Sequence, residues 1–347
     1  MGGSREDSGK CQCARYVFFL KKRREKMSGR SPIQNQAEKI FRHTRSNSFG
    51  TRSRYQSSCR KFIEHLDDHF KMKNLRNIQD KHLVSYIKHR QSQGVAPKTI
   101  KNDIGAIKYM HDLIPRAKHA LSNNDELKKG FSISLEQTPA VKGDRAWTQQ
   151  EYESMQKRTS EIIQKGEKGA ETARDARDVM KICRTMGLRV TEAVAVSRAQ
   201  AEKAVRSGIY QVKNEAKNGK WRKVPLSQEG KEVFIERFPK TSRGQRFFIR
   251  QEEKTHEAVN RLEKFMSNHC SKLETPEGVE KRTWRKSDKT YTNSLTFHGL
   301  RYGYVQDRVQ EEVNQGFSLE QAAMRVTQEV GHERGKVILV YLGGRTP

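Results

Sequence analysis

Apolar residues recur every three to four positions between residues 33 and 131, and this spacing constrains the fold of that stretch more than any other feature. Such spacing places apolar side chains on one face of a helix. Three sets follow it: Tyr55, Cys59, Phe62, Ile63, Leu66 and Phe70; Leu83, Val84 and Ile87; and Ile100, Ile104, Ile107, Met110 and Ile114. Thr51 or Ser53 is a candidate cap for the first helix, and Gly94 and Pro97 precede the last. The pattern predicts a small all-helical domain.

The pattern after residue 146 differs and predicts a mixed α+β domain. Thr148 and Glu151 form a Thr-x-x-Glu capping box at a helix start. Asn218-Gly219 lies between extended stretches at 209–212 and 221–224, which is typical of a β-hairpin. Further helices are expected at about 175–186, 228–238 and 255–270. The predicted fold class is therefore mainly α, with a small β-hairpin or sheet.

These patterns divide the chain into four parts. Residues 1–34 are basic and are expected to form a flexible leader, which is unstructured, an extension upstream of a start at Met27, or an arm that touches DNA. The helical domain covers residues 35–133. A polar linker with Pro139 and Gly143 follows at 134–146. The second domain covers residues 147–347.

The charge of the chain indicates its partner. Lys and Arg number 69 against 41 Asp and Glu, a formal charge of +28, so a polyanion is expected. The longest apolar run, Val17 to Leu20, is far shorter than the roughly 20 residues needed to cross a bilayer. We expect no membrane partner. We expect a cytoplasmic, nucleoid-associated location. The five scattered cysteines suit a reducing compartment, and Cys11-x-Cys13 has no second pair at zinc spacing, so no metal site is predicted.

The last fifty residues carry groups suited to phosphate chemistry. His298 and Arg301 stand in a His-x-x-Arg motif, and His332 precedes Tyr341 by nine positions. An arginine guanidinium offers a fork that matches two phosphate oxygens. A tyrosine hydroxyl can attack phosphorus when a base or positive surroundings assist it. With an earlier arginine, Arg189, and a hairpin lysine, this set has what cleavage of a phosphodiester without metal requires.

In order and spacing these residues resemble the tyrosine recombinases of the phage-integrase family. The three signature boxes of that family match Gly187-Leu188-Arg189-Val190-Thr191-Glu192, His298-Gly299-Leu300-Arg301, and Gly331-His332 with Tyr341. The family's catalytic lysine lies seven residues before a Val-Pro-Leu, here residues 224–226, which indicates Lys217; Lys220 and Lys223 are the alternatives. The resemblance covers residues 35 to 347. It implies an all-helical core-binding domain followed by a mixed α+β catalytic domain.

The resemblance also implies a mechanism. Tyr341 would attack the scissile phosphate, which gives a 3′-phosphotyrosyl link and a free 5′-hydroxyl. Arg189, Arg301 and His332 would hold the phosphate through the transition state. Lys217 would protonate the leaving oxygen. No metal, ATP or other cofactor is required, because the covalent link conserves the energy of the broken bond.

Four further positions bear on this site. The resemblance implies that His298 assists the tyrosine and that Glu192 supports the site from behind, although an ordinary ion pair on a helix surface also explains Glu192. Tyr302 and Tyr304 are alternatives to Tyr341 by residue type, but they crowd the second box and fit the core better.

DNA contacts are expected from four lysines. Lys98, Lys101 and Lys108 lie on or near the polar side of the last helix of the first domain, and Lys220 lies in the hairpin. A charged outer face is also what any solvated helix shows. The partners that the resemblance implies are double-stranded DNA with inverted half-sites, further copies of the chain in a tetrameric synapse, and accessory DNA-bending proteins.

The expected function is site-specific recombination, with integration or excision of a mobile genetic element as the setting. Two alternatives are a type IB topoisomerase-like DNA relaxation and a basic DNA-binding protein without catalysis. Six residues follow Tyr341, fewer than the C-terminal helix of many relatives. Subunit contacts are therefore expected elsewhere, with the polar stretch at 274–293 as a candidate for subunit or DNA contact.

Overall fold

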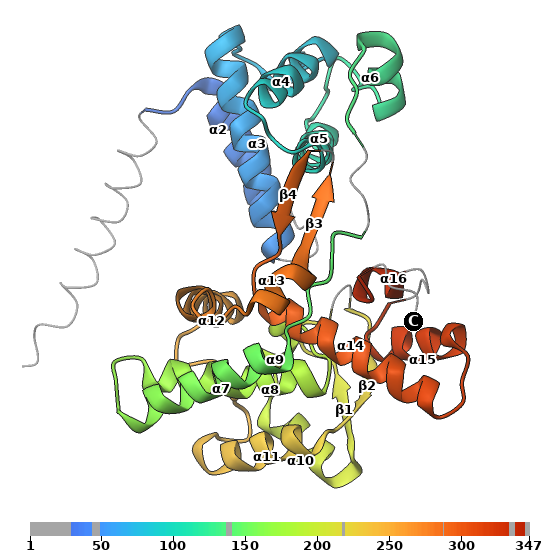
Figure 1. The fold of residues 1–347 in the computed structure, drawn as a ribbon. Helices are drawn as coiled ribbons and strands as arrows, with labels where there is room; N and C mark the ends of the chain where they lie inside the picture. The colour runs from blue at the N-terminus through green and yellow to red at the C-terminus, as the bar shows by residue number, and fades with distance from the viewer. Residues whose placement is uncertain are drawn as a thin grey trace, which may run out of the picture. The chain divides into compact units, whose positions relative to one another are not determined.

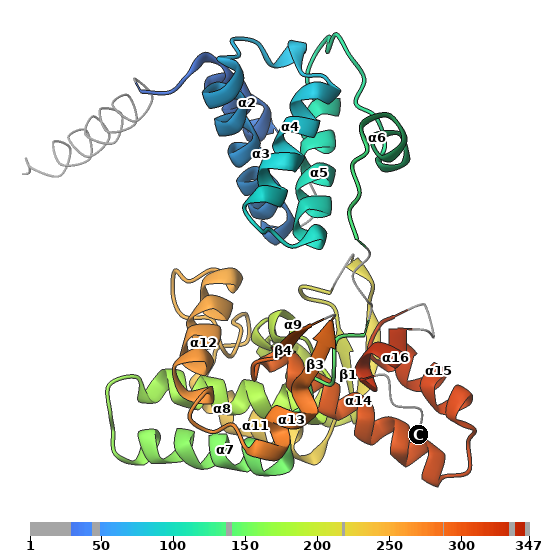
Figure 2. The ribbon, with the colours of Figure 1, turned by 45° about the horizontal axis from the view of Figure 1, so that its top comes forward.

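The computed structural model describes residues 29–43, 49–136, 141–216, 219–286, 288–332 and 337–343. The chain divides into two compact units, residues 1–138 and 139–347. Figures 1 and 2 show both units. Most of the predicted leader lies outside the described residues, and so does Lys217.

The first unit is all-helical, as the apolar spacing predicts. Its elements are α2 (Pro32–His43), α3 (Phe49–Phe70), η1 (Leu75–Asn77), α4 (Asp80–Ser92), α5 (Pro97–Asp112) and α6 (Asn124–Phe131). Helices α2 to α5 lie side by side (Figures 1 and 2) and bury one apolar core between them. Phe62 and Tyr86 meet edge to face in this core, with ring centroids 5.3 Å apart.

The start of α3 differs from the expectation. Because the helix already runs from Phe49, Thr51 and Ser53 lie inside its first turns and not at its N-cap position. The apolar spacing alone could not locate this start, because the first turn of α3 carries few core residues. Helix α5 begins at Pro97, whose fixed backbone angle suits the first turn of a helix.

The second unit is mainly helical with two short antiparallel hairpins. Its helices are α7 (Gln149–Gln164), α8 (Ala170–Thr185), α9 (Val190–Val194), α10 (Arg198–Ser207), α11 (Gln228–Arg237), η3 (Phe238–Lys240), α12 (Thr255–Cys270), α13 (Pro276–Arg282), α14 (Phe297–Asn314), α15 (Leu319–Glu329) and α16 (Ile338–Tyr341). Strand β1 (Ile209–Val212) pairs with β2 (Arg222–Pro225), and β3 (Thr283–Lys286) pairs with β4 (Lys289–Thr292). The predicted fold class, mainly α with a small hairpin or sheet, is confirmed.

Helix α8 is the centre of the second unit. Helices α7, α11, α12 and α14 pack against it, and its residues Val179, Met180, Ile182 and Cys183 are fully buried. The predicted Thr-x-x-Glu box begins α7: Thr148 Oγ1 accepts from the Glu151 backbone N–H at 3.2 Å, and Glu151 accepts from the Thr148 N–H at 2.9 Å. α8 then ends at the first residues of the candidate site.

Part of the predicted linker belongs to the second unit. The Asn293 side-chain amide donates to the backbone carbonyl of Lys142 at 2.6 Å, and Asp144 and Ala146 are buried. The polar stretch 274–293 forms α13 and the β3–β4 hairpin, in which Trp284 and Tyr291 stack at 4.7 Å. Buried Arg282 at the end of α13 donates to both carboxylate oxygens of Glu151, at 2.9 and 2.7 Å. This buried pair joins α13 to the first turn of α7.

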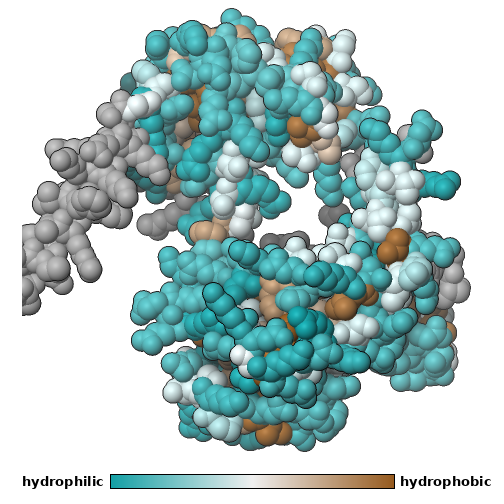
Figure 3. Space-filling model, turned by 60° about the vertical axis from the view of Figure 1, so that its left-hand side comes forward, coloured by the Kyte–Doolittle hydropathy of each residue, from teal (hydrophilic) through white to brown (hydrophobic). Residues whose placement is uncertain are grey.

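The surface is mostly hydrophilic. Figure 3 shows polar side chains over most of the visible face of each unit, with small separate hydrophobic patches. Among the described residues, no helix combines the length and the apolar character that a membrane span needs.

Candidate active site

The loop after α8 brings the first arginine into the site. Gly187 has φ +61°, and a Cβ added there would lie 2.3 Å from the Tyr304 ring, so only glycine fits this turn. Two residues later, Arg189 occupies the N-cap position of α9. Its backbone N–H donates to Glu192 Oε2 and its Nη1 to Glu192 Oε1, both at 2.8 Å. The tight turn and this local pair fix the guanidinium of Arg189.

Glu192 is a buried carboxylate shared by two arginines. Besides Arg189, it accepts from Arg222 Nη1 at 2.8 Å and Nη2 at 2.7 Å. Burial opposes the ionisation of Glu192, but its hydrogen bonds to Arg222 and the charges of Arg222 and Arg189 outweigh burial and lower its pKa to about 2. The ion pair with Arg189 is therefore no ordinary surface pair.

Arg222 is a residue of this site that the sequence reasoning missed. It lies at the start of β2, and its Nε donates to the backbone carbonyl of Glu329 at 2.8 Å. Arg222 thereby ties the β1–β2 hairpin to Glu192 on one side and to the end of α15 on the other. The sequence offers only a weak indication of this role. Arg222 lies five residues after the expected catalytic lysine, in a predicted hairpin that is rich in basic residues.

Arg301 is the second arginine of the set and is completely buried on α14. Its Nη1 donates to the Gly187 carbonyl and its Nη2 to the Val330 carbonyl. Its Nε donates to the hydroxyl of Tyr341 at 3.3 Å. Backbone carbonyls from two distant segments therefore orient this guanidinium.

Tyr341 is buried on α16, with its hydroxyl inside a cationic cluster. Nε2 of His332 lies 3.0 Å from Tyr341 Oη and 3.5 Å from Nη2 of Arg189. The Gln306 side-chain amide donates to the Tyr341 backbone carbonyl at 2.8 Å, which fixes the helix that carries the phenol. Positive groups placed around an attacking oxygen stabilise the charge that develops on it.

The two alternative tyrosines have other contacts. The Tyr304 hydroxyl donates to Glu329 Oε2 at 2.9 Å. The Tyr302 ring packs on the Tyr341 ring with centroids 4.5 Å apart. Burial raises the pKa of both phenols, which disfavours either as a nucleophile. These contacts suit the supporting roles that the sequence favours for Tyr302 and Tyr304.

His298 lies at the exposed rim of the cluster, with its ring centroid 6.1 Å from that of Tyr341. Loss of hydration in the site, together with the positive charges of Arg301, Arg145, Arg189 and His332, lowers the pKa of His298 to about 4. The ring is then neutral at pH 7. Arg145, which also lies over the Tyr302 ring, is a second residue that the sequence reasoning missed.

We expect His298 in the free protein to titrate near pH 4 instead of near 6.5. Between these values the unfolded chain binds a proton that the folded chain does not, so the free energy of unfolding falls as the pH falls from about 6.5 to 4. NMR of histidine-labelled protein measures the midpoint, with His298→Gln to assign the signal. Arg145→Gln removes a like charge and raises the midpoint. A His298 midpoint at 6.5 or above contradicts this account.

The structure thus brings together five of the six predicted catalytic side chains: Arg189, His298, Arg301, His332 and Tyr341. The sixth, Lys217, lies outside the described residues. The hairpin next to it is held at the cluster through Arg222.

The predicted DNA-binding lysines have different environments. Lys98 and Lys220 are exposed. Nζ of Lys101 donates to the Glu136 carbonyl at 3.3 Å. Lys108 is half-buried, and burial lowers its pKa. The nearby carboxylates of Asp80, Glu126 and Asp112 raise this pKa, but their effect is smaller than that of burial. Lys98 and Lys220 are thus more exposed than Lys101 and Lys108.

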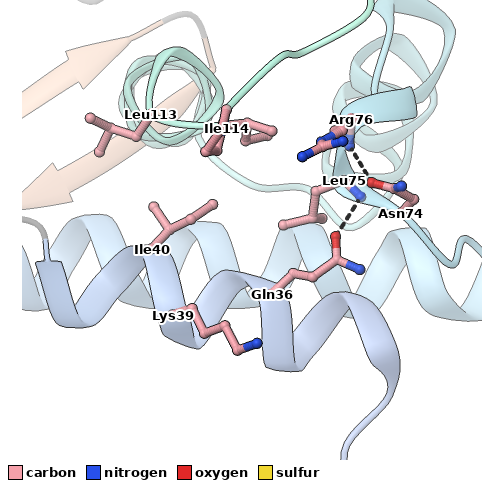
Figure 4. Close-up of a pocket in the computed structure, with 9 residues that line it drawn as sticks. Gln36, Lys39, Ile40, Asn74, Leu75, Arg76, Leu113 and Ile114 are labelled. Carbon is pink, nitrogen blue, oxygen red and sulfur yellow. Dashed lines mark hydrogen bonds between the residues drawn. The ribbon is translucent and has the colours of Figure 1, made fainter.

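The first unit has an apolar pocket of about 560 Å³ without comparable chemistry. In Figure 4, Ile40, Leu75, Leu113 and Ile114 gather around it, and Gln36 is hydrogen-bonded to the Leu75 backbone N–H. Its charged lining residues are Lys39 and Arg76. With no nucleophile or base among its lining residues, this pocket is not a second candidate active site.

Comparison with known proteins bears on the fold of the chain. Residues 33–120 match the family model of the phage integrase N-terminal domain. The XerH site-specific recombinase bound to palindromic difH substrate, in a post-cleavage complex, is 18% identical with a TM-score of 0.55, over 88% of this chain and 80% of that one. The Tn1549 transposon integrase in complex with transposon right end DNA is 15% identical with a TM-score of 0.53, over 91% of this chain and 96% of that one.

The chain has the tyrosine-recombinase fold. A pre-cleavage complex of XerH with difH substrate matches similarly, with 18% identity and a TM-score of 0.52. No curated protein sequence matches the chain. The fold that the sequence resemblance implies is therefore confirmed, whereas the roles of the individual site residues stay predictions.

Proposed function

We propose that this chain is a site-specific DNA recombinase, which cuts and rejoins DNA through a covalent tyrosine intermediate. One observation carries the proposal: the Tyr341 hydroxyl lies 3.0 Å from His332 Nε2 and 3.3 Å from Arg301 Nε, in a tyrosine-recombinase fold. A phenol held between a histidine and a guanidinium suits attack on a phosphodiester.

The covalent step exchanges one phosphoester for another. The oxygen of Tyr341 attacks the scissile phosphorus, the bond to the 5′-oxygen breaks, and a 3′-phosphotyrosyl link forms. His298, neutral at pH 7, helps remove the phenolic proton, and Lys217 gives a proton to the leaving 5′-oxygen. A second 5′-hydroxyl then reverses the step and rejoins the strands without ATP or metal.

Two arginines and a histidine offset the charge of the phosphate. Arg301 Nε donates to the Tyr341 hydroxyl, His332 Nε2 lies 3.0 Å from that hydroxyl, and Arg189 Nη2 lies 3.5 Å from the same histidine nitrogen. Glu192 and Arg222 act as positioning residues, because the carboxylate holds Arg189 and the arginine ties the hairpin to it. Donors fixed before the reaction stabilise the transition state without further reorganisation.

The partner that suits this chemistry is double-stranded DNA. The formal charge of +28 favours a polyanion, and its binding is expected to weaken steeply with salt. Inverted half-sites, a tetrameric synapse and accessory DNA-bending proteins belong to the same proposal. Lys98 and Lys220 are the proposed phosphate contacts, and integration or excision of a mobile genetic element is the proposed setting.

Covalent capture tests this function. The protein is incubated in EDTA with sheared DNA from its own source and denatured with detergent, and the protein-linked fragments are sequenced. We expect adducts for the wild type and for Tyr304→Phe, no adducts for Tyr341→Phe, and inverted half-sites in the recovered fragments.

Other outcomes decide between the alternatives. Adducts that persist in Tyr341→Phe place the nucleophile elsewhere. Adducts without a shared sequence, together with relaxation of any supercoiled plasmid, indicate a topoisomerase. DNA binding without adducts indicates a non-catalytic protein. The solved structures described above are recombinases and integrases, which favours the recombinase among these alternatives.

A further inference from the structure

Three histidines converge in the first unit, which contains none of the candidate active-site residues. His65 and His69 lie four residues apart on α3, which places both on one face of that helix. His89 lies on α4, which packs against α3. One ring nitrogen from each histidine lies within 4.8 Å of the others. We propose that His65, His69 and His89 bind a divalent transition-metal cation, with Zn²⁺ as the preferred ion.

The buried histidine is oriented as a metal ligand would be. His65 is 5% exposed, and its Nε2 lies 3.1 Å from Ser85 Oγ. The tautomer that donates from Nε2 to this hydroxyl leaves a lone pair on Nδ1, a buried atom without a hydrogen-bond partner. A hydrogen bond on the second ring nitrogen is the usual way in which proteins orient a metal-binding histidine.

The other two rings have room to adjust. His69 is exposed and His89 half-buried, and the ring centroids of the three histidines lie 4.3, 5.1 and 5.5 Å apart. Zn–N bonds of about 2.0–2.1 Å with tetrahedral geometry need ring nitrogens roughly 3.4 Å apart. The exposed His69 and the half-buried His89 would both have to move toward His65 for this contraction.

The surroundings suit a cation with an open fourth position. The three rings line a cavity of about 280 Å³, together with the carboxylates of Glu64 and Asp68 and the ammonium group of Lys61. Arg90 also lines the cavity. Its Nε lies 3.5 Å from Asp103 Oδ2, so the carboxylate of Asp103 offsets the positive charge of Arg90.

The set of donors selects the metal. Neutral imidazoles favour Zn²⁺, Cu²⁺ and Ni²⁺ over Mg²⁺ or Ca²⁺, which prefer oxygen ligands. A bound ion would join α3 to α4 and stabilise the first unit. This role is independent of the phosphodiester chemistry, which uses no metal.

Metal titration of the full-length chain, with any histidine tag removed, tests the site. After treatment with EDTA and removal of the chelator, the protein is titrated with ZnCl₂ against a competing colorimetric chelator. We expect one Zn²⁺ per chain at this site and a higher melting temperature of the first unit. His69→Gln, at an exposed position, is expected to lower the affinity for Zn²⁺ on the order of 100-fold or more. Loss of a residue that only orients a metal ligand already lowers metal affinity about 10–100-fold.

Matched variants separate ligand loss from a general effect. His89→Gln behaves like His69→Gln, Ser85→Ala weakens binding about 10-fold, and His119→Gln, an exposed histidine outside the cluster, changes nothing. The visible absorption of Co²⁺-loaded protein reports the ligand set directly and is lost in His69→Gln. No tight Zn²⁺ binding, or binding that His69→Gln and His89→Gln leave unchanged, overturns the proposal.

Discussion

Arg301→Lys is expected to slow covalent cleavage of DNA by about 10²–10³-fold while leaving DNA affinity within a few-fold of the wild type. The structure gives the reason. Arg301 uses three nitrogens at once, toward the Gly187 carbonyl, the Val330 carbonyl and the Tyr341 hydroxyl. A lysine keeps the positive charge but has no planar fork, so it cannot hold these positions and a phosphate oxygen together.

The measurement is the rate of adduct formation on a fixed DNA substrate under single-turnover conditions, with affinity measured separately. Arg308→Lys is the matched control, since Arg308 lies on the same helix and pairs with Glu312 and Glu329, away from the phenol. Equal melting temperatures for the two variants exclude a folding defect as the cause. A cleavage rate for Arg301→Lys within tenfold of the control contradicts the role of Arg301 in the transition state.

The sequence predicts most of the fold because local patterns determine it. Helical spacing identifies α3, α4 and α5, the Thr148–Glu151 box begins α7, and Asn218-Gly219 predicts the β1–β2 hairpin. The order of motifs also indicates the residues that the structure gathers around Tyr341. Each of these signals lies within a few residues of the chain, where geometry follows from the local sequence.

The contacts that join distant segments could not be predicted in this way. Glu192 and Arg222 are 30 residues apart, and nothing in either segment shows that they meet as a buried ion pair. Arg282 and Glu151 are 131 residues apart and pair in the same manner. The three-histidine cluster could not be predicted from the sequence. His65 and His69 lie on a helix whose apolar spacing is that of an ordinary core helix, and His89 comes from the next helix.

The buried Glu192 explains why the first signature box extends to a glutamate. Its carboxylate bonds to Arg189 and Arg222 at once, so loss of this group leaves two guanidiniums without their shared partner. Removal of one member of a buried pair is costly because the remaining charge stays desolvated. The box therefore contains both the proposed phosphate-binding arginine and the carboxylate that holds it.

Lys217→Ala is expected to slow cleavage of an ordinary substrate by about 10²–10⁴-fold, the range of general acid catalysis. The 5′-oxygen leaves as a strongly basic alkoxide unless a proton reaches it in the transition state. On a substrate in which sulfur replaces the bridging 5′-oxygen, the leaving thiolate is far less basic and needs no proton. The same variant is then expected to cleave this substrate within about tenfold of the wild-type rate.

This comparison identifies the acid, because a structural defect slows both substrates alike. Lys220→Ala and Lys223→Ala are the matched controls, since both lysines lie in or beside the same hairpin and are the alternatives on residue type. If one of them shows the selective loss on the oxygen substrate, it is the acid in place of Lys217. If all three lysines lose activity equally on both substrates, the hairpin contributes DNA contacts, and the proton for the leaving oxygen comes from elsewhere in the cluster around Tyr341.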